Sequence, residues 1–149
     1  MTDKTQHPIK IALIPGANRP VGKAIARKFA ENGVALVLPQ YSDWPEATNQ
    51  MNDEFKAAGY DFISPFCDLT RTEEVEKLIE DISAHYGGLH YLINNIERGG
   101  MPIVHGSYRK VVNNGQWELE FNTTLKSKWN LVNCALPLLQ KSGEGSVVN

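Results

Sequence analysis

The sequence predicts an α/β fold, a doubly wound parallel sheet of about five strands with helices on both faces. Short apolar segments alternate along the chain with longer segments whose apolar residues recur every three or four positions. The short segments show little alternation of apolar and polar residues, which is typical of strands buried on both faces. Strands that alternate with helices pair in parallel through right-handed crossovers.

The first half of the chain contains two strand–helix units. Residues 9–14 are an apolar strand that ends at a Pro-Gly pair, and the helix that follows ends at Gly33. Residues 34–38 are the second strand. The second helix has Asp43 as a candidate N-cap and Gly59 as its end.

The second half continues the same alternation. Residues 60–66 form the third strand, and Thr70 with Glu73 fits a capping box at the start of the third helix. Residues 89–94 form the fourth strand. After them we expect a glycine-rich loop at 97–115, a long helix from about Gln116 to Gln140 and a fifth strand at 145–149.

The composition is that of a single globular domain. Of 149 residues, 42% are hydrophobic and 21% are charged, and the net charge of −2 offers no cationic surplus for nucleic acid or anionic lipid. The two cysteines and four histidines lack metal-site spacing, so we expect no metal. The polar N-terminus does not resemble a signal peptide and no apolar run could span a membrane, so we expect a cytoplasmic location.

The turn between the first strand and the first helix is a candidate dinucleotide-binding loop. Gly16 allows a tight turn, and Gly22 lets the helix pack closely on the sheet. The free N–H groups of the first helical turn suit a pyrophosphate. Glycines in a strand–helix turn can equally serve packing alone, and the loop by itself does not separate the two interpretations.

Several stretches, taken in order, resemble the short-chain dehydrogenase/reductase family. That family opens with Thr-Gly-x-x-x-Gly-x-Gly, and here residues 15–22 read PGANRPVG. "FCDLT" contains Asp68 at the position that contacts adenine in the family, Asn94-Asn95 follow the fourth strand, and "WELEFNTTL" contains Asn122. The resemblance implies one Rossmann-like dinucleotide-binding domain over residues 1–149. It implies a cofactor site of Gly16, Asn18, Arg19, Val21, Gly22, Asp68, Leu69 and Asn94.

Two departures from the family pattern bear on this site. Pro20 replaces a glycine, but proline is favoured at the first helical position, so the Val21 amide should stay available to phosphate. Ile96-Glu97 replaces Ala-Gly beside the expected cofactor path. Either these two side chains hinder the cofactor, or Ile96 packs in the core and Glu97 faces solvent.

The choice between NADP and NAD depends on the end of the second strand. An acidic residue at its tip would hold a ribose 2′-hydroxyl and indicate NAD, but no acidic residue stands directly there. Arg19 occupies a position where NADP users of the family often have a basic residue, and a guanidinium suits a 2′-phosphate. We therefore favour NADP. NAD stays open because Asp43 could reach the ribose, and Arg19 could be an ordinary solvated arginine.

The resemblance implies an NAD(P)-dependent oxidoreductase that moves hydride between nicotinamide and a small-molecule carbonyl or alcohol. In the family, Asn122 supports a proton relay whose serine and Tyr-x-x-x-Lys follow the fifth strand. The sequence contains no Tyr-x-x-x-Lys and stops at Asn149, so we expect residues 1–149 to be truncated before the catalytic segment and inactive alone. The alternative is a non-catalytic nucleotide-binding or interaction module on the same fold.

The long last helix has a broad apolar surface. Core packing explains part of it, and the excess suggests a second copy of the chain, so we expect a homo-oligomer. The residues of this surface are Trp117, Phe121, Leu125, Trp129, Val132, Leu136 and Leu139.

Overall fold

Five parallel strands of the computed structural model form one sheet in the order β3-β2-β1-β4-β5. The structure describes residues 9–42, 44–96, 115 and 117–149. The strands are β1 (Ile11–Leu13), β2 (Ala35–Val37), β3 (Phe62–Ile63), β4 (Tyr91–Ile93) and β5 (Ser146–Val148). The helices are α1 (Pro20–Glu31), α2 (Pro45–Ala57), α3 (Thr72–Tyr86), the π-helical segment η1 (Phe121–Lys126) and α5 (Ser127–Lys141). The predicted fold class is confirmed.

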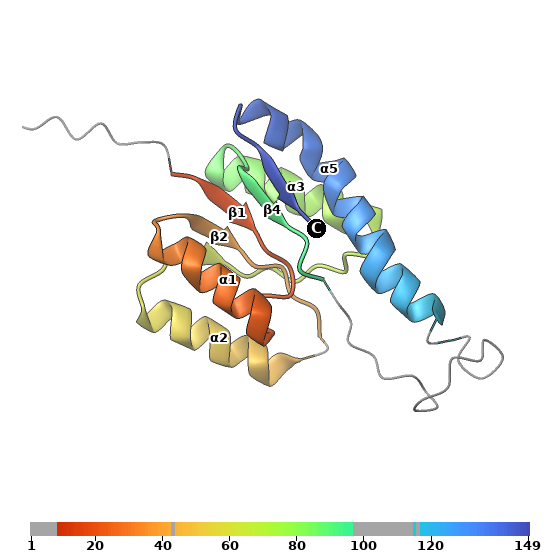
Figure 1. Ribbon diagram of the computed structural model, residues 1–149, viewed down its shortest axis with the longest axis horizontal. Helices are drawn as coiled ribbons and strands as arrows, with labels where there is room; N and C mark the ends of the chain where they lie inside the picture. The colour runs from red at the N-terminus through yellow and green to blue at the C-terminus, as the bar shows by residue number, and fades with distance from the viewer. Residues whose placement is uncertain (1–8, 43, 97–114, 116) are drawn as a thin grey trace, which may run out of the picture.

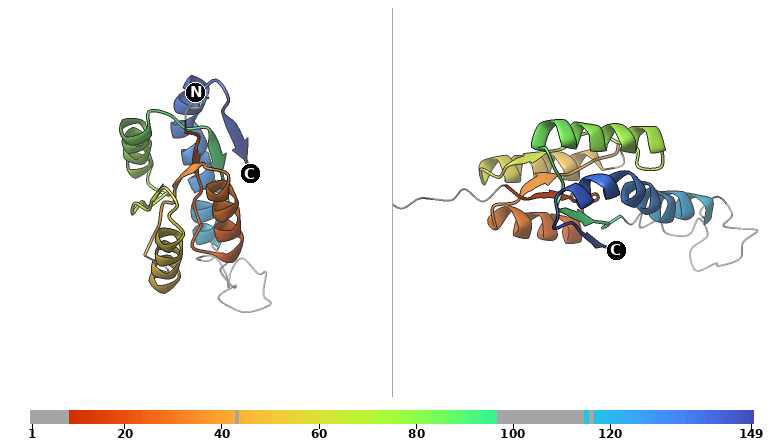
Figure 2. Two further views of the ribbon diagram at one scale, coloured as in Figure 1. Left: turned by 90° about the vertical axis from the view of Figure 1, so that its left-hand side faces the viewer. Right: turned by 90° about the horizontal axis from the view of Figure 1, so that it is seen from above.

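The sheet is covered by helices on both faces (Figures 1 and 2). Ile11 and Leu13 of β1 point into a core shared with α3 and α5. Ala12, which lies between them, points into a second core shared with α1 and α2. Because successive strand residues point to opposite faces, two apolar cores require strands that are apolar at every position. This requirement explains the unbroken apolar runs in the sequence.

The order of the strands reverses at β1. The chain runs from β1 outward to β2 and β3 and then returns to β4 on the other side of β1. A reversal of this kind marks the switch point at which doubly wound sheets bind ligands, beyond the carboxyl ends of the strands.

The third strand is shorter than predicted. Residues 60–66 were expected in the sheet, but the regular ladder covers Phe62–Ile63 only. Pro65 has no N–H to donate, although its carbonyl oxygen accepts the Gln40 N–H at 2.9 Å. The Cys67 N–H in turn donates to the Gln40 carbonyl at 2.9 Å, so the segments that follow β2 and β3 stay side by side beyond the regular ladder.

Candidate functional site

The turn after β1 depends on two glycines. Gly16 has φ +70°, and a Cβ placed there would lie 2.5 Å from the Asn95 carbonyl oxygen. A Cβ on Gly22 would collide with the Gly16 carbonyl oxygen and lie 2.6 Å from Asn95 Nδ2. Both glycines therefore let the turn, α1 and the chain after β4 approach one another closely.

Helix α1 begins at Pro20, and this start leaves amide donors unpaired. Arg19, the N-cap, is extended at φ −100° and ψ 157°, as expected for a residue before proline. The Lys23 N–H donates to the Arg19 carbonyl at 2.8 Å. Within the described part of the chain, the N–H groups of Val21 and Gly22 have no acceptor. Two amides at the positive end of a helix are a suitable site for a phosphate.

The segment after β3 presents one carboxylate oxygen of Asp68. Its Oδ1 accepts the Thr70 N–H at 3.0 Å and the Thr70 hydroxyl at 2.7 Å. The Asp68 N–H donates to Glu74 Oε2 at 2.7 Å. Asp68 Oδ2 has no partner among the described residues, so it can accept a hydrogen bond from a ligand.

The same contacts show that the predicted capping box is wrong. Helix α3 starts at Thr72 with Arg71 as N-cap and without a side-chain cap. Thr70 closes a turn with Asp68 instead, because an aspartate side chain competes for backbone donors two residues ahead. Glu74, which the sequence analysis missed, accepts the hydrogen bond from the Asp68 amide.

Asn130 is a second residue that the sequence analysis missed. It is fully buried in α5, and its Nδ2 donates to the Leu69 carbonyl at 3.0 Å. Its Oδ1 accepts the Thr72 hydroxyl at 3.4 Å. Asn130 thus links α5 to the segment of Asp68 and Leu69, which is predicted to bind the cofactor. No local signal distinguishes it from a helix-surface asparagine, because its partners lie about sixty positions earlier.

The two asparagines after β4 have different surroundings. Asn94 is buried, and its Nδ2 donates to Asn149 Oδ1 at 2.8 Å, which links the ends of β4 and β5. Its Oδ1 is buried without a partner among the described residues. Asn95 lies against the turn after β1, with Nδ2 3.5 Å from the Gly16 carbonyl oxygen. The residue that reaches the glycine turn is therefore Asn95, whereas Asn94 supports the sheet behind it.

The long helix is irregular at Asn122. The expected helix, whose start at Gln116 lies outside the described residues, contains the π-helical segment Phe121–Lys126. The Asn122 carbonyl accepts the Ser127 N–H five residues on, and the Ser127 hydroxyl also donates to it at 3.2 Å. Such segments occur frequently at functional sites because they shift side chains by one position.

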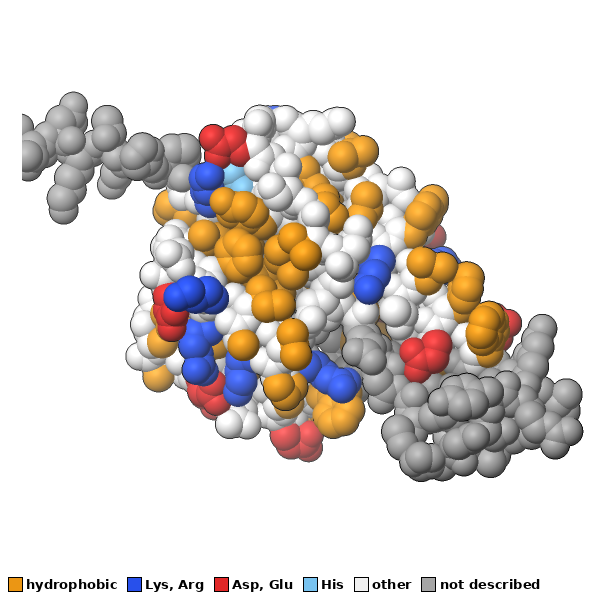
Figure 3. Space-filling view, in the orientation of Figure 1, with side chains coloured by type: hydrophobic (Ala, Val, Ile, Leu, Met, Phe, Trp, Pro, Cys, Tyr) orange, Lys and Arg blue, Asp and Glu red, His pale blue; other side chains and the backbone are white. Residues whose placement is uncertain are grey.

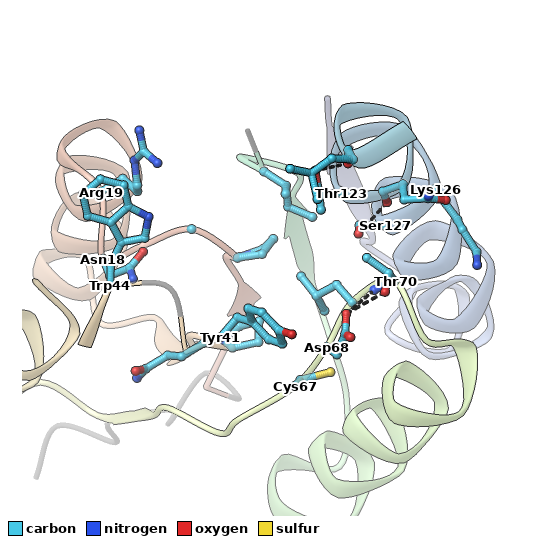
Figure 4. A pocket seen from close by; sticks show the side chains of 18 residues that line it. Asn18, Arg19, Tyr41, Trp44, Cys67, Asp68, Thr70, Thr123, Lys126 and Ser127 are labelled. Carbon is cyan, nitrogen blue, oxygen red and sulfur yellow. Dashed lines mark hydrogen bonds between the residues drawn. The ribbon is translucent and has the colours of Figure 1, made fainter. Parts of the chain in front are cut away.

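These elements enclose a cavity of about 450 Å³, a volume typical of ligand sites (Figure 4). It lies between the turn after β1, the ends of β2 and β3, and the segment that contains Asn122. Six of the nine predicted site residues line it, namely Gly16, Asn18, Arg19, Asp68, Leu69 and Asn122. The other three lie outside its lining, namely Val21, Gly22 and Asn94.

The rim of the cavity after β2 is aromatic and basic. Tyr41 and Trp44 line it, and the Arg19 guanidinium carbon lies 4.9 Å from the centre of a Trp44 ring. Tyr41 stacks on Phe66 with ring centres 5.5 Å apart. Asp43, the residue that would favour NAD, lies outside the described residues.

Cys67 and Ile96 also line the cavity. Cys67 lies at the floor, where burial, with a smaller contribution from the Glu74 and Asp68 carboxylates, raises the pKa of its thiol to about 12. Ile96 packs partly into the α3–α5 core, as one of the two alternatives for Ile96-Glu97 predicted, and it also lines the cavity. Glu97 lies outside the described residues.

Comparison with known proteins assigns the family. A family model described as short chain dehydrogenase matches residues 10–149. The chain belongs to the short-chain dehydrogenase/reductase family. The resemblance predicted from the sequence is therefore confirmed over nearly the whole chain.

Curated short-chain dehydrogenase/reductase relatives are about twice as long as this chain. The 3-oxoacyl-acyl-carrier-protein reductase FabG of Staphylococcus aureus is 26% identical over 140 residues, which are 94% of this chain and 54% of FabG. A tropinone reductase homologue of Arabidopsis thaliana is 31% identical over 144 residues, with 93% of this chain and 50% of the relative covered. The chain spans about half the length of the curated relatives it matches.

Solved short-chain dehydrogenase/reductase structures agree with the fold. A structure from Burkholderia phymatum in complex with NAD superposes with a TM-score of 0.78 at 26% identity, covering 95% of this chain and 48% of that one. A metagenomic short-chain oxidoreductase in complex with NADP gives a TM-score of 0.72 at 26% identity, covering 93% and 60%. Both nicotinamide cofactors therefore occur among similar structures.

Two further findings concern membranes and metals. None of the helices in the described ranges has the length and apolar character needed to cross a membrane. The same residues contain no cluster of three or more His, Cys, Asp or Glu side chains that could hold a metal ion.

Proposed function

We propose that the chain is the cofactor-binding portion of an NAD(P)-dependent oxidoreductase with a preference for NADP(H). The observation that supports this most directly is the cavity at the carboxyl ends of β1, β2 and β3, which is lined by the Asp68 carboxylate and the Arg19 guanidinium. A nicotinamide dinucleotide would supply hydride chemistry, and the whole protein would use it on a small-molecule carbonyl or alcohol.

The pyrophosphate, the adenine and the 2′-phosphate of the dinucleotide each have a matching group in this chain. The Val21 and Gly22 amides at the start of α1 bind the pyrophosphate, which the glycine turn allows to approach the backbone. Asp68 Oδ2 accepts a hydrogen bond from the adenine amino group, and Leu69 contacts the ring. Arg19 binds the 2′-phosphate. These assignments extend the family resemblance to side chains that line or support the cavity.

Asn122 is assigned to the substrate side of the same cavity. It lines the cavity, and the Ser127 N–H and hydroxyl both hold its backbone carbonyl within the π-helical segment. By resemblance it supports a proton relay rather than exchanging a proton with substrate. Its substitution by alanine should therefore lower turnover of the whole protein without changing cofactor affinity.

Calorimetric titration with two adenosine nucleotides tests the cofactor assignment without requiring a substrate. Adenosine 2′,5′-bisphosphate contains the 2′-phosphate of NADP, and 5′-AMP lacks it. The parent chain should bind the bisphosphate more tightly. Arg19→Ala should cost about 1–3 kcal/mol with the bisphosphate, the size of a hydrogen bond to a charged group, and little with 5′-AMP. Arg27→Ala, which removes an exposed α1 arginine bound to Glu54, is the matched control.

Two results would contradict this assignment. If Arg19→Ala lowers the affinity for both nucleotides equally, Arg19 does not bind the 2′-phosphate. Absence of binding of either nucleotide to the parent would favour occlusion of the path by Ile96-Glu97, and Glu97→Gly should then restore binding.

A second copy of the chain is the partner that we propose for the last helix. Trp117, Phe121, Leu125 and Trp129 recur every four residues and are all more than half exposed. Trp117 stacks on Phe121 with ring centres 6.2 Å apart. Figure 3 shows hydrophobic side chains in a row along this helix. One apolar stripe packs on its own copy about a two-fold axis, so one surface suffices for both partners.

Sedimentation velocity tests this association. The chain should sediment as a dimer at micromolar concentration, and Trp129→Glu should yield monomers, because it places a charge within the stripe. Lys128→Glu, a neighbouring charge change off the stripe, should leave the dimer intact. A parent chain that stays monomeric at these concentrations would exclude the interface.

A further inference from the structure

Trp44 lies where the loop after β2 enters α2, and the cofactor assignment gives it no role. It is the N-cap of α2, and its carbonyl accepts the Thr48 N–H at 3.1 Å, so its backbone is fixed by the helix. Its side chain is 48% exposed and lines the cavity. A large aromatic side chain that stays half exposed at a cavity rim is a candidate for contact with a ligand or with a ligand-binding residue.

The contact that Trp44 makes is with Arg19. The guanidinium carbon lies 4.9 Å from a ring centre of the indole, within the range of a cation–π interaction. Figure 4 shows the two side chains together at one end of the cavity. No carboxylate pairs with Arg19 within the described ranges, so the indole is the contact that orients its side chain there.

The backbones that present these two side chains are fastened together. Asn18 Nδ2 donates to Thr48 Oγ1 at 2.9 Å, which links the turn before α1 to the first turn of α2. Farther along, Glu54 of α2 binds two cations of α1, Lys23 at 3.2 Å and Arg27 at 3.0 Å. The cation–π pair therefore spans two elements whose relative position is already set.

The guanidinium N–H groups of Arg19 have no acceptor among the described residues, so the contact with Trp44 leaves them available to a ligand. An arginine interacts with an aromatic ring through its planar face, whereas its N–H donors point outward in the plane. A flexible arginine would lose rotamer entropy when it bound a phosphate, and an arginine already held on an indole loses less. Orientation by Trp44 thus favours a ligand that has a phosphate at this rim.

We propose that Trp44 is a positioning residue that holds Arg19 for the 2′-phosphate and thereby increases the preference for NADP(H) over NAD(H). This inference rests on the proposed function, since it needs Arg19 to bind that phosphate. It concerns selectivity between two nucleotides and not their shared adenosine part.

The test is a set of titrations of the chain with adenosine 2′,5′-bisphosphate and 5′-AMP. Trp44→Leu should weaken bisphosphate binding about two- to fivefold, the equivalent of one exposed cation–π contact, and leave 5′-AMP binding unchanged. Trp44→Phe keeps an aromatic face and should recover most of the loss. In the Arg19→Ala background, Trp44→Leu should have no further effect on either nucleotide.

The outcomes separate this inference from the proposed function. If Arg19→Ala leaves the selectivity between the nucleotides unchanged, the NADP assignment and the role of Trp44 both fail. If Arg19→Ala removes selectivity but Trp44→Leu does not reduce it, only the role of Trp44 fails. Equal weakening of both nucleotides by Trp44→Leu would show that the indole contacts the shared adenosine, which also overturns the inference. Thermal unfolding of each variant verifies folding. If Trp44→Leu does not fold, Trp44→Gln, which also removes the aromatic face, takes its place with the same expected result.

Discussion

The substitution Gly22→Ala has two opposing effects on the free energy of unfolding. Inside a helix, alanine is more favourable than glycine by about 1 kcal/mol. The added Cβ, however, would lie 2.6 Å from Asn95 Nδ2 and closer still to the Gly16 carbonyl oxygen. Overpacking of this kind typically costs about 1–3 kcal/mol.

The obstructing oxygen cannot move without breaking other contacts. The Gly16 carbonyl accepts the Arg19 N–H at 3.2 Å and faces Asn95 Nδ2 at 3.5 Å. Its residue is also in the left-handed region at φ +70°. We therefore expect the steric cost to exceed the propensity gain, and Gly22→Ala to lower the free energy of unfolding by about 1–2 kcal/mol. For a domain of this size that is a fall in Tm of about 3–7 °C.

Thermal denaturation followed by circular dichroism measures this effect. The matched control is Ala24→Gly, an exposed position of the same helix, which changes propensity alone and should cost about 0.5–1 kcal/mol. In the titrations above, Gly22→Ala should also weaken both nucleotides, because the turn must shift. A Gly22→Ala chain that melts at or above the parent temperature would show that the turn adapts and that close packing does not require glycine.

Three further predictions concern Asn130, His90 and Cys67. Asn130→Ala removes the donor to the Leu69 carbonyl and should cost about 1–3 kcal/mol in chemical denaturation, whereas Asn133→Ala, whose side chain caps only the Trp129 carbonyl, should cost less; equal costs would contradict the anchoring role of Asn130. His90 Nδ1 accepts the Ile11 N–H at 3.2 Å, and burial, aided by the Lys10 charge and opposed by Glu144, lowers the pKa of His90 below its ordinary value of 6.5. As the pH falls, His90 is therefore protonated in the unfolded chain at a higher pH than in the folded chain. Its contribution to the free energy of unfolding should be fully present above pH 6.5 and decline as the pH falls toward the folded-state pKa. His90→Asn, which keeps an acceptor and does not titrate, should flatten the pH dependence of Tm, and an unchanged slope would exclude His90 as its source. With a thiol pKa of about 12, Cys67 should react with a disulfide reagent at pH 8 only after unfolding, and rapid labelling of Cys67 in the folded chain, located by peptide mapping, would contradict its burial.

Much of the fold follows from local patterns. The alternation of apolar strands and amphipathic helices, the turn glycines and the proline at the start of α1 each act over a few residues, so a linear sequence reveals them. Family resemblance added Asp68 and Asn122, which line the cavity, and Asn94, which is buried outside its lining. The predicted helix cap and strand bounds were wrong where two local patterns competed for the same residues. Thr70 pairs with Asp68 rather than capping α3, and Pro65 interrupts the third strand.

The arrangement of the site was decided by contacts between distant parts of the chain. Arg19 meets Trp44 because α1 and α2 lie side by side on one face of the sheet. Asn130 reaches Leu69 because α5 packs on the opposite face, and Asn95 reaches Gly16 because β4 pairs with β1. The sequence alone determined which elements form, since their propensities and caps are local. Only the tertiary structure decided which side chains share the cavity, because strand order and helix packing bring them together from positions 25 to 79 residues apart.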